Sequence, residues 1–220
     1  MAMAQGKFIT VEGGEGVGKS TNIDFICELI RSRGHDVVET REPGGTPLAE
    51  RIREMLLEHG DEDLPDETEL LLFFAARSLH LHNLIRPALR SGTWVVCDRF
   101  TDATRAYQGS GRGLDLSRIE WLAEWVHGDL NPHLTILLDA APHIGMKRAG
   151  ERGEADRLET EQAEFHLRVR EGYLRQAATE PKRFAVVDAD QPLPAVQAAI
   201  EAALYRLLDD QDSEDVRVIS

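Results

Sequence analysis

Short apolar runs alternate along the chain with longer segments of helical periodicity. Five runs have the length and composition of buried strands, and they cover residues 8–11, 36–39, 94–98, 134–139 and 184–188. Strands that alternate with helices predict a parallel sheet covered by helices on both faces. We therefore expect an α/β fold, a three-layer α/β/α sandwich with a five-stranded parallel sheet.

Between the strands, apolar positions recur at helical spacing. Helices are predicted at residues 19–33, 47–58, 67–90, 116–127, 142–149, 161–179 and 193–208. Glycine-containing and charged segments at 41–46, 108–113 and 148–157 read as functional loops. We expect one domain at residues 1–208 with a lid at 148–157, followed at 209–220 by an acidic, mobile tail.

A phosphate-binding loop is the most specific motif of the chain. The full G-x-x-x-x-G-K-[ST] pattern is filled by Gly13, Gly14, Glu15, Gly16, Val17, Gly18, Lys19 and Ser20. In such a loop, backbone N–H groups and the following helix N-terminus bind phosphates. Lys19 adds charge at the β/γ phosphates, and Ser20 supplies a ligand to Mg²⁺. A glycine-rich turn that only joins a strand to a helix is the alternative, but the complete motif and its flanks favour binding of a nucleoside triphosphate.

Composition limits the partners that the chain can have. The 220 residues are 42% hydrophobic, enough for one α/β domain, and carry a formal net charge of −14. This charge argues against nucleic acid or an anionic membrane as partner. The longest apolar run, residues 70–76, is too short to cross a bilayer, and the first residues lack a signal-peptide pattern. Cys27 and Cys97 are expected to be buried free thiols, so we expect a cytoplasmic protein.

Histidines and one arginine receive non-functional interpretations. His80 and His82 are near neighbours, but positions i and i+2 of a helix point about 200° apart and cannot bind one ion. We expect these two, with His127 and His166, to be surface or capping histidines. Arg105 is expected to be a solvated surface charge.

Polar residues directly follow the predicted strands, where ligands bind in open α/β sheets. Asp98 ends an apolar strand, the position at which phosphate-loop proteins keep a carboxylate for Mg²⁺. A helix cap is an equally good interpretation of a single aspartate there. Residues 41–43 and 190–192 follow two other strands.

Taken together, these segments resemble the thymidylate kinases, nucleoside monophosphate kinases with a P-loop. The resemblance runs from residue 7 to about 208 and depends on the phosphate loop and on residues 41–46, 73–77, 98–100, 106–109 and 153–157. It implies transfer of the γ-phosphoryl group of ATP to dTMP with Mg²⁺, giving dTDP for dTTP synthesis. It also implies a homodimer.

The resemblance assigns the acceptor contacts. Phe73 stacks on thymine and Arg77 donates to a thymine carbonyl, and their i, i+4 spacing places both on one helix face. Core packing remains the alternative for Phe73. Thr104 is placed at the base edge and Tyr107 beside the sugar, where its ring crowds a ribose 2′-hydroxyl. The remaining dTMP contacts are assigned to Arg41, Pro43, Arg99, Gln108 and Glu15.

Within these contacts, Arg41 and Arg99 clamp the acceptor phosphate. Glu15 faces the 3′-hydroxyl of the acceptor sugar. The Glu42–Pro43 bond is a candidate cis peptide.

The resemblance also concerns the donor side. Positions Gly14 to Val17 hold no basic residue, whereas Arg148, Arg152 and Arg157 populate the lid, as in the form of the family with a lid arginine. Arg152 is the expected transition-state donor, so the catalytic residues are Lys19, Arg99 and Arg152. Arg148 stacks on adenine, and further ATP contacts come from Thr21 and Gln191.

Three other functions remain open from the residues. A kinase of the same fold could act on another nucleoside monophosphate or on a deoxynucleoside. A GTPase switch is disfavoured because the chain has no N-K-x-D segment. A nucleotide-dependent interaction module would bind ATP tightly without turnover.

Overall fold

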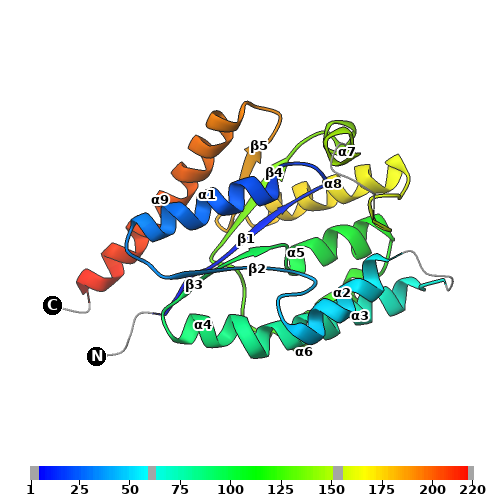
Figure 1. Ribbon diagram of the computed structural model, residues 1–220, viewed down its shortest axis with the longest axis horizontal. Helices are drawn as coiled ribbons and strands as arrows, with labels where there is room; N and C mark the ends of the chain where they lie inside the picture. Colours follow the sequence, from blue (N-terminus) through cyan, green and yellow to red (C-terminus); the bar gives the residue numbers. More distant parts are fainter. Residues whose placement is uncertain (1–4, 59–62, 151–155, 218–220) are drawn as a thin grey trace.

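The computed structural model describes residues 5–58, 63–150 and 156–217 and is built on one parallel sheet. Its five strands are β1 (Phe8–Gly13), β2 (Val37–Arg41), β3 (Trp94–Asp98), β4 (Leu134–Asp139) and β5 (Phe184–Asp188). They lie side by side in the order β2-β3-β1-β4-β5, every pair parallel (Figure 1). The predicted α/β/α fold is confirmed. All five carboxyl ends therefore meet at one edge, where ligands bind in such sheets.

Helices cover both faces of this sheet. On one face, α1 (Lys19–Ser32) and α9 (Leu193–Arg217) pack against side chains such as Ile9 and Val11. Alternate residues of β1 point to the opposite face, where Phe8 packs with η1 (Leu81–Ile85) and α4 (Arg86–Arg90). That face also carries α8 (Ala163–Thr179), which contacts β4 and β5. The sheet is thus buried on both sides, as expected from its nearly continuous apolar strands.

The remaining helices surround the carboxyl edge and the lower face in Figure 1. They are α2 (Pro47–Leu57), α3 (Asp66–His80), η1 (Leu81–Ile85), α4 (Arg86–Arg90), α5 (Thr101–Thr104), η2 (Arg105–Gly111), α6 (Leu116–Val126) and α7 (Pro142–Gly150). Residues 66–90 form the predicted long helix, and its middle turn, η1, has π geometry. Pro87 lies inside this continuous helix, directly after the π turn, and its ring removes one N–H from the helical ladder.

The predicted loop at residues 108–113 is wrong, because the chain is helical through Gly111. Gly109 and Gly111 serve close packing, and only Gly113, with a φ of 83°, has the backbone conformation of a turn glycine. A Cβ on Gly109 would lie 2.6 Å from the Leu116 side chain, and one on Gly111 would lie 2.6 Å from the Phe165 ring. η2 therefore approaches α6 and α8 more closely than residues with side chains would allow.

The C-terminal helix is longer than predicted. α9 continues from Leu193 to Arg217, so the backbone of the acidic run 209–215 is helical. Residues 218–220 of the predicted tail lie outside the described ranges. Across the described ranges, none of the helices has both the length and the apolar character needed to cross a membrane.

Candidate active site

A cavity of about 270 Å³ opens at the carboxyl ends of β1, β2 and β3. It lies at the sheet edge where the sequence predicts a nucleotide site. The structure brings most of the predicted site residues into its wall, namely Glu15, Gly16, Val17, Gly18, Lys19, Ser20, Arg41, Pro43, Phe73, Arg77, Asp98, Arg99, Thr104, Tyr107 and Gln108.

The phosphate loop forms one wall of this cavity. Gly16 and Gly18 have φ angles of 64° and 90°, which residues with a Cβ rarely adopt. Lys19 is buried, and its Nζ donates to the carbonyl oxygen of Gly14 at 2.9 Å. Burial and the nearby Arg99 lower the pKa of Lys19. Gly13 and Gly14 do not line this cavity and instead line a smaller hollow behind the loop.

A buried ion pair forms the far end of the cavity. Arg77, only 1% exposed, donates from Nε to Glu42 Oε2 at 2.7 Å and from Nη2 to Thr104 Oγ1 at 2.9 Å. Its Nη1 is buried, and within the described part of the chain no atom accepts a hydrogen bond from it. Phe73, one turn earlier on α3, lines the cavity and also packs into a core cluster. The two interpretations of Phe73 are therefore compatible.

Glu42 explains why the guanidinium of Arg77 is fixed. Burial alone would raise the pKa of Glu42, but Arg77 and His80 lower it below its usual value. His80 Nδ1 lies 3.1 Å from Glu42 Oε1, and its Nε2 lies 2.7 Å from Thr40 Oγ1. His80 is fully buried, so the predicted surface position is wrong. The Glu42–Pro43 bond is cis, as suggested by the sequence.

A second cluster joins the phosphate loop to β3. Arg99 Nη2 donates to Glu15 Oε1 at 2.5 Å, and the Tyr107 hydroxyl donates to the same oxygen at 2.6 Å. Burial opposes ionisation of Glu15, but Arg99 and Lys19 lower its pKa to about 2. The Arg99 guanidinium also lies 4.6 Å from the centre of the Tyr107 ring. Glu15, an unusual residue in an anion site, therefore stays ionised, and the positive charges of Arg99 and Lys19 balance its charge.

The residues predicted to bind a metal ion share the same wall. Ser20 and Asp98 both line the cavity, and Asp98 Oδ1 is buried without a hydrogen-bond partner. A buried carboxylate oxygen without a donor is a suitable ligand for a cation. No cluster of three or more His, Cys, Asp or Glu able to hold a metal occurs within the described ranges. This donor set fits Mg²⁺, which proteins hold with few carboxylates together with phosphates and waters.

At the cavity mouth the ion pairs are exposed. Arg41 Nη2 donates to Glu50 Oε2 at 2.9 Å, and the Arg41 side chain is 54% exposed. Arg53 was not predicted from the sequence, yet it lines the cavity and donates to the Pro43 carbonyl at 2.9 Å. Its position in the periodic pattern of α2 carries no signal that distinguishes it from a solvated arginine.

The predicted ATP contacts outside the phosphate loop do not line the cavity. Thr21, Arg148 and Gln191 are exposed. Arg148 Nη1 donates to the Ala189 carbonyl at 3.2 Å, and Gln191 Nε2 donates to Asp188 at 2.9 Å. These contacts hold Arg148 and Gln191 beside the end of β5.

Only part of the predicted lid can be compared with the structure, because Arg152 lies outside the described residues. Arg157 is bound to the acceptor side. It donates from Nε to the Leu56 carbonyl at 2.9 Å and from Nη2 to the buried Glu69. Glu69 also accepts from Gln108 Nε2 at 2.7 Å. Arg157 thus fastens the end of the lid to α2 and α3.

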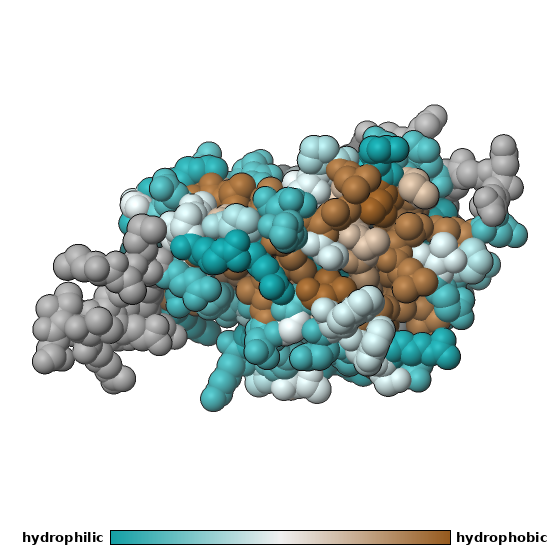
Figure 2. Space-filling view, turned by 90° about the horizontal axis from the view of Figure 1, so that it is seen from below, coloured by the Kyte–Doolittle hydropathy of each residue, from teal (hydrophilic) through white to brown (hydrophobic). Residues whose placement is uncertain are grey.

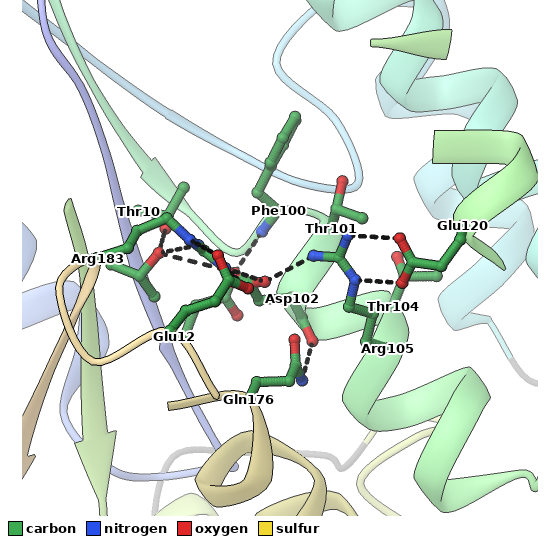
Figure 3. Close-up of polar contacts among 12 residues, drawn as sticks. Thr10, Glu12, Phe100, Thr101, Asp102, Thr104, Arg105, Glu120, Gln176 and Arg183 are labelled. Atoms are coloured by element: carbon green, nitrogen blue, oxygen red, sulfur yellow. Dashed lines mark hydrogen bonds and ion pairs between the residues drawn. The ribbon is translucent and has the colours of Figure 1, made fainter. Parts of the chain in front are cut away.

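Other polar residues differ from expectation. Arg105 is not a solvated charge, because it lies between Asp102 and Glu120 with Nη1 2.9 Å from Asp102 Oδ1 and Nε 2.7 Å from Glu120 Oε1 (Figure 3). His127 is the C-cap residue of α6, as the capping alternative predicted, but it is buried; His166 is buried, contrary to prediction, and His82 is exposed. Their burial is a tertiary effect that helical spacing does not indicate. Cys27 and Cys97 are buried free thiols, as predicted.

Comparison with known proteins identifies the family. The family model described as thymidylate kinase matches residues 11–200. This chain belongs to the thymidylate kinase family. The thymidylate kinase of Chromohalobacter salexigens is 58% identical over 94% of this chain and 98% of its own length. That of Methylococcus capsulatus is 55% identical with the same coverage. The crystal structure of thymidylate kinase from Ehrlichia chaffeensis has a TM-score of 0.73 at 35% identity, covering 91% of this chain and 99% of that one.

Proposed function

We propose that the cavity is the site at which this thymidylate kinase transfers the γ-phosphoryl group of ATP to dTMP. The observation that carries the proposal is the arrangement of its two ends. The phosphate loop lies at one end, and at the other Arg77 presents a buried N–H that no protein atom accepts. A buried donor is costly unless a ligand or water satisfies it. A thymine carbonyl at that end would satisfy it.

The base end is suited to a pyrimidine held in one orientation. Arg77 cannot rotate freely, because Glu42 and Thr104 hold two of its nitrogens. Its remaining Nη1 donates to a thymine carbonyl, and Phe73 stacks on the ring. Thr104 and Gln108 lie at the base edge, both buried in the cavity wall. A site with fixed polar partners discriminates by leaving them unpaired when the wrong base binds.

The sugar and acceptor phosphate lie between the base end and the phosphate loop. Arg41 and Arg99 clamp the acceptor phosphate with planar guanidinium groups, and Pro43 lines the same wall. Glu15 accepts the 3′-hydroxyl. Tyr107, held by Glu15, places its ring against the sugar and crowds a 2′-hydroxyl. The site therefore favours a deoxyribonucleotide.

The donor triphosphate binds along the phosphate loop. Gly13 to Val17 and Gly18 provide backbone N–H groups, Lys19 contacts the β/γ phosphates, and Thr21 lies beside the loop on α1. Arg148 and Gln191, beside the end of β5, contact the adenosine. Ser20 and Asp98 would hold Mg²⁺, which would neutralise phosphate charge when bound.

Catalysis requires alignment and charge neutralisation, without a covalent intermediate. Lys19 and Arg99 neutralise charge on the two sides of the migrating group, and Arg152 of the lid adds a donor when the lid closes over it. An arginine that meets the phosphoryl group only in the closed state stabilises the transition state more than the ground state. The phosphate loop, with no basic residue from Gly14 to Val17, leaves this role to the lid.

We propose further that the protein is a homodimer through α3 and α6. Four large apolar side chains are about half exposed or more on these helices, namely Leu71 (58%), Leu116 (51%), Trp121 (64%) and Trp125 (74%). Figure 2 shows the apolar surface gathered on the face along which these helices run. Such a patch is typical of an interface, and a second copy covers it in the dimer implied by the family.

The free thiols support a reducing compartment, the cytoplasm.

A coupled ADP-release assay tests the substrate assignment. With ATP and Mg²⁺, dTMP should be the preferred acceptor over dUMP, dCMP, thymidine and the ribonucleotide of thymine. Preference for another monophosphate or for thymidine would replace the acceptor assignment with that of a related kinase. ATP binding without any ADP release would instead indicate an interaction module.

A further inference from the structure

Glu12 is a buried carboxylate of β1 that has no contact with the cavity. It lies one residue before the phosphate loop and is 0% exposed. The alternation along β1 places it on the same face as Phe8, toward α5 and α8. A buried carboxylate costs free energy unless donors satisfy it. Both of its oxygens are satisfied, and both bonds lead to Arg99.

The first bond fixes the backbone next to Arg99. Glu12 Oε1 accepts from the Phe100 backbone N–H at 2.7 Å (Figure 3). Arg99 has a φ of 67°, the one positive value among non-glycine residues of the described ranges. Left-handed backbone at such a residue persists only where the surroundings hold it. β1 does so on both sides, since the Arg99 N–H donates to the Val11 carbonyl at 3.1 Å.

The second bond reaches the Arg99 side chain through Tyr173 of α8. The Tyr173 hydroxyl donates to Glu12 Oε2 at 2.8 Å, and Arg99 Nη1 donates to the same hydroxyl at 3.2 Å. Tyr173 is 1% exposed, so water does not replace this link. Because a hydroxyl that donates to one group is well placed to accept from another, Glu12 sets the direction of both bonds.

We propose that Glu12 is a positioning residue for the acceptor-phosphate clamp. It fixes the backbone of Arg99 through Phe100 and the guanidinium through the Tyr173 hydroxyl, so that Arg99 faces Glu15 and the cavity before dTMP binds. The proposal rests on the proposed role of Arg99 in binding the acceptor phosphate. A preorganised guanidinium does not have to be ordered when the phosphate arrives, which favours binding.

Two conservative variants separate the links. Tyr173→Phe removes only the hydroxyl between Glu12 and Arg99. Burial raises the pKa of Glu12 to about 8, so the variants are assayed at pH 9, where Glu12→Gln keeps an oxygen for the Phe100 N–H but offers an amide donor where Tyr173 needs an acceptor. Each variant should raise the KM for dTMP about tenfold, the size of one hydrogen bond to a charged group. The KM for ATP should stay within about twofold.

The double variant provides the sharpest measurement. Because both changes break the same chain of bonds, Glu12→Gln with Tyr173→Phe should raise the KM for dTMP no further than either change alone. Tyr205→Phe is the matched control, since its hydroxyl also donates to a glutamate, Glu201, but on α9 away from the cavity. It should leave both KM values unchanged.

The outcomes separate this inference from the function on which it rests. If Arg99→Lys leaves the KM for dTMP unchanged, the clamp role is wrong and the inference falls with it. If Arg99→Lys raises that KM but Tyr173→Phe does not, the clamp stands and the positioning role of Glu12 is overturned. Equal rises in both KM values, or additive effects in the double variant, also overturn it. Should Glu12→Gln fail to fold, Tyr173→Phe against Tyr205→Phe still decides.

Discussion

The acceptor half and the donor half of the site are built differently. The proposed acceptor half is built on paired charges, with Arg77 and Glu42 buried at one end and Arg99 and Glu15 partly buried at the other. On the donor half, Arg148 and Gln191 are exposed and contact only strand-end residues. The two halves meet at the phosphate loop.

This difference indicates how the two substrates are recognised. A site that must distinguish one base from several similar bases needs polar groups that are held in place before the base binds. Buried hydrogen-bond networks hold polar groups in this way. Triphosphate recognition depends on backbone N–H groups and so requires little from side chains. The exposed donor half is compatible with the proposal that a lid arginine completes the site.

The largest effect is expected where the halves meet. Lys19→Ala removes the charge at the β/γ phosphates and should lower kcat about 10³-fold, because a preorganised charge is lost from a water-poor site. The fold should survive, since the glycines and not Lys19 determine the loop geometry. Lys182→Ala, which removes an exposed lysine, is the control. Near-normal turnover of Lys19→Ala would contradict the phosphate-loop assignment.

The next effect compares a buried and an exposed arginine within the proposed acceptor half. Arg77→Ala leaves Glu42 buried without its main partner and should lower the free energy of unfolding by about 3 kcal/mol. Arg41→Ala breaks an exposed pair with Glu50 and should cost less than about 1 kcal/mol. Urea denaturation measures both. Arg77→Ala should also raise the KM for dTMP more than the KM for ATP, and similar losses of stability in the two variants would remove the comparison.

A smaller effect is expected on the donor half. Arg152→Ala should lower kcat about tenfold to a hundredfold, less than the best cases of donated arginines because the lid holds several. The KM for dTMP should hardly change. Arg157→Ala is the control within the lid, since its guanidinium is bound to Glu69 and to the Leu56 carbonyl. If Arg148, Arg152 and Arg157 all tolerate alanine, the lid supplies no catalytic charge.

The local pattern of apolar and polar residues predicted the strands and most helices of the fold and the residues at the carboxyl edge of the sheet. The apolar runs of β3, β4 and β5 end at aspartates, so their bounds could be read from the sequence. The glycines of η2 could not, because the close packing that requires them involves residues such as Phe165, far along the chain. The phosphate-loop motif and the family resemblance together identified most of the residues that line the cavity.

The sequence did not indicate which buried side chains hold the cavity residues in position. Glu12 reads as a polar interruption of an apolar strand, and Tyr173 as one aromatic residue of a helix. Their roles depend on contacts with Arg99, which come from three distant segments. The same holds for His80, predicted to be exposed but buried against Glu42. The periodicity of apolar residues describes one helix or strand at a time, whereas these contacts join several elements that are far apart in the sequence.

The last prediction compares the pH dependence of two glutamates within the proposed acceptor half. Burial and the Asp102 carboxylate raise the pKa of Glu12 to about 8, whereas Arg99 and Lys19 hold that of Glu15 at about 2 against its own burial. Between pH 4.5 and 8 the unfolded chain has released the Glu12 proton and the folded chain retains it. The free energy of unfolding should therefore fall by about 1 kcal/mol per pH unit from this group as pH rises through that window. Glu15 acts in the opposite sense, and only below pH 4.5. Urea denaturation at pH 5, 6, 7 and 8 should show Glu12→Gln gaining stability relative to the unmodified chain as pH rises, and parallel curves would mean that Glu12 is already ionised at pH 5.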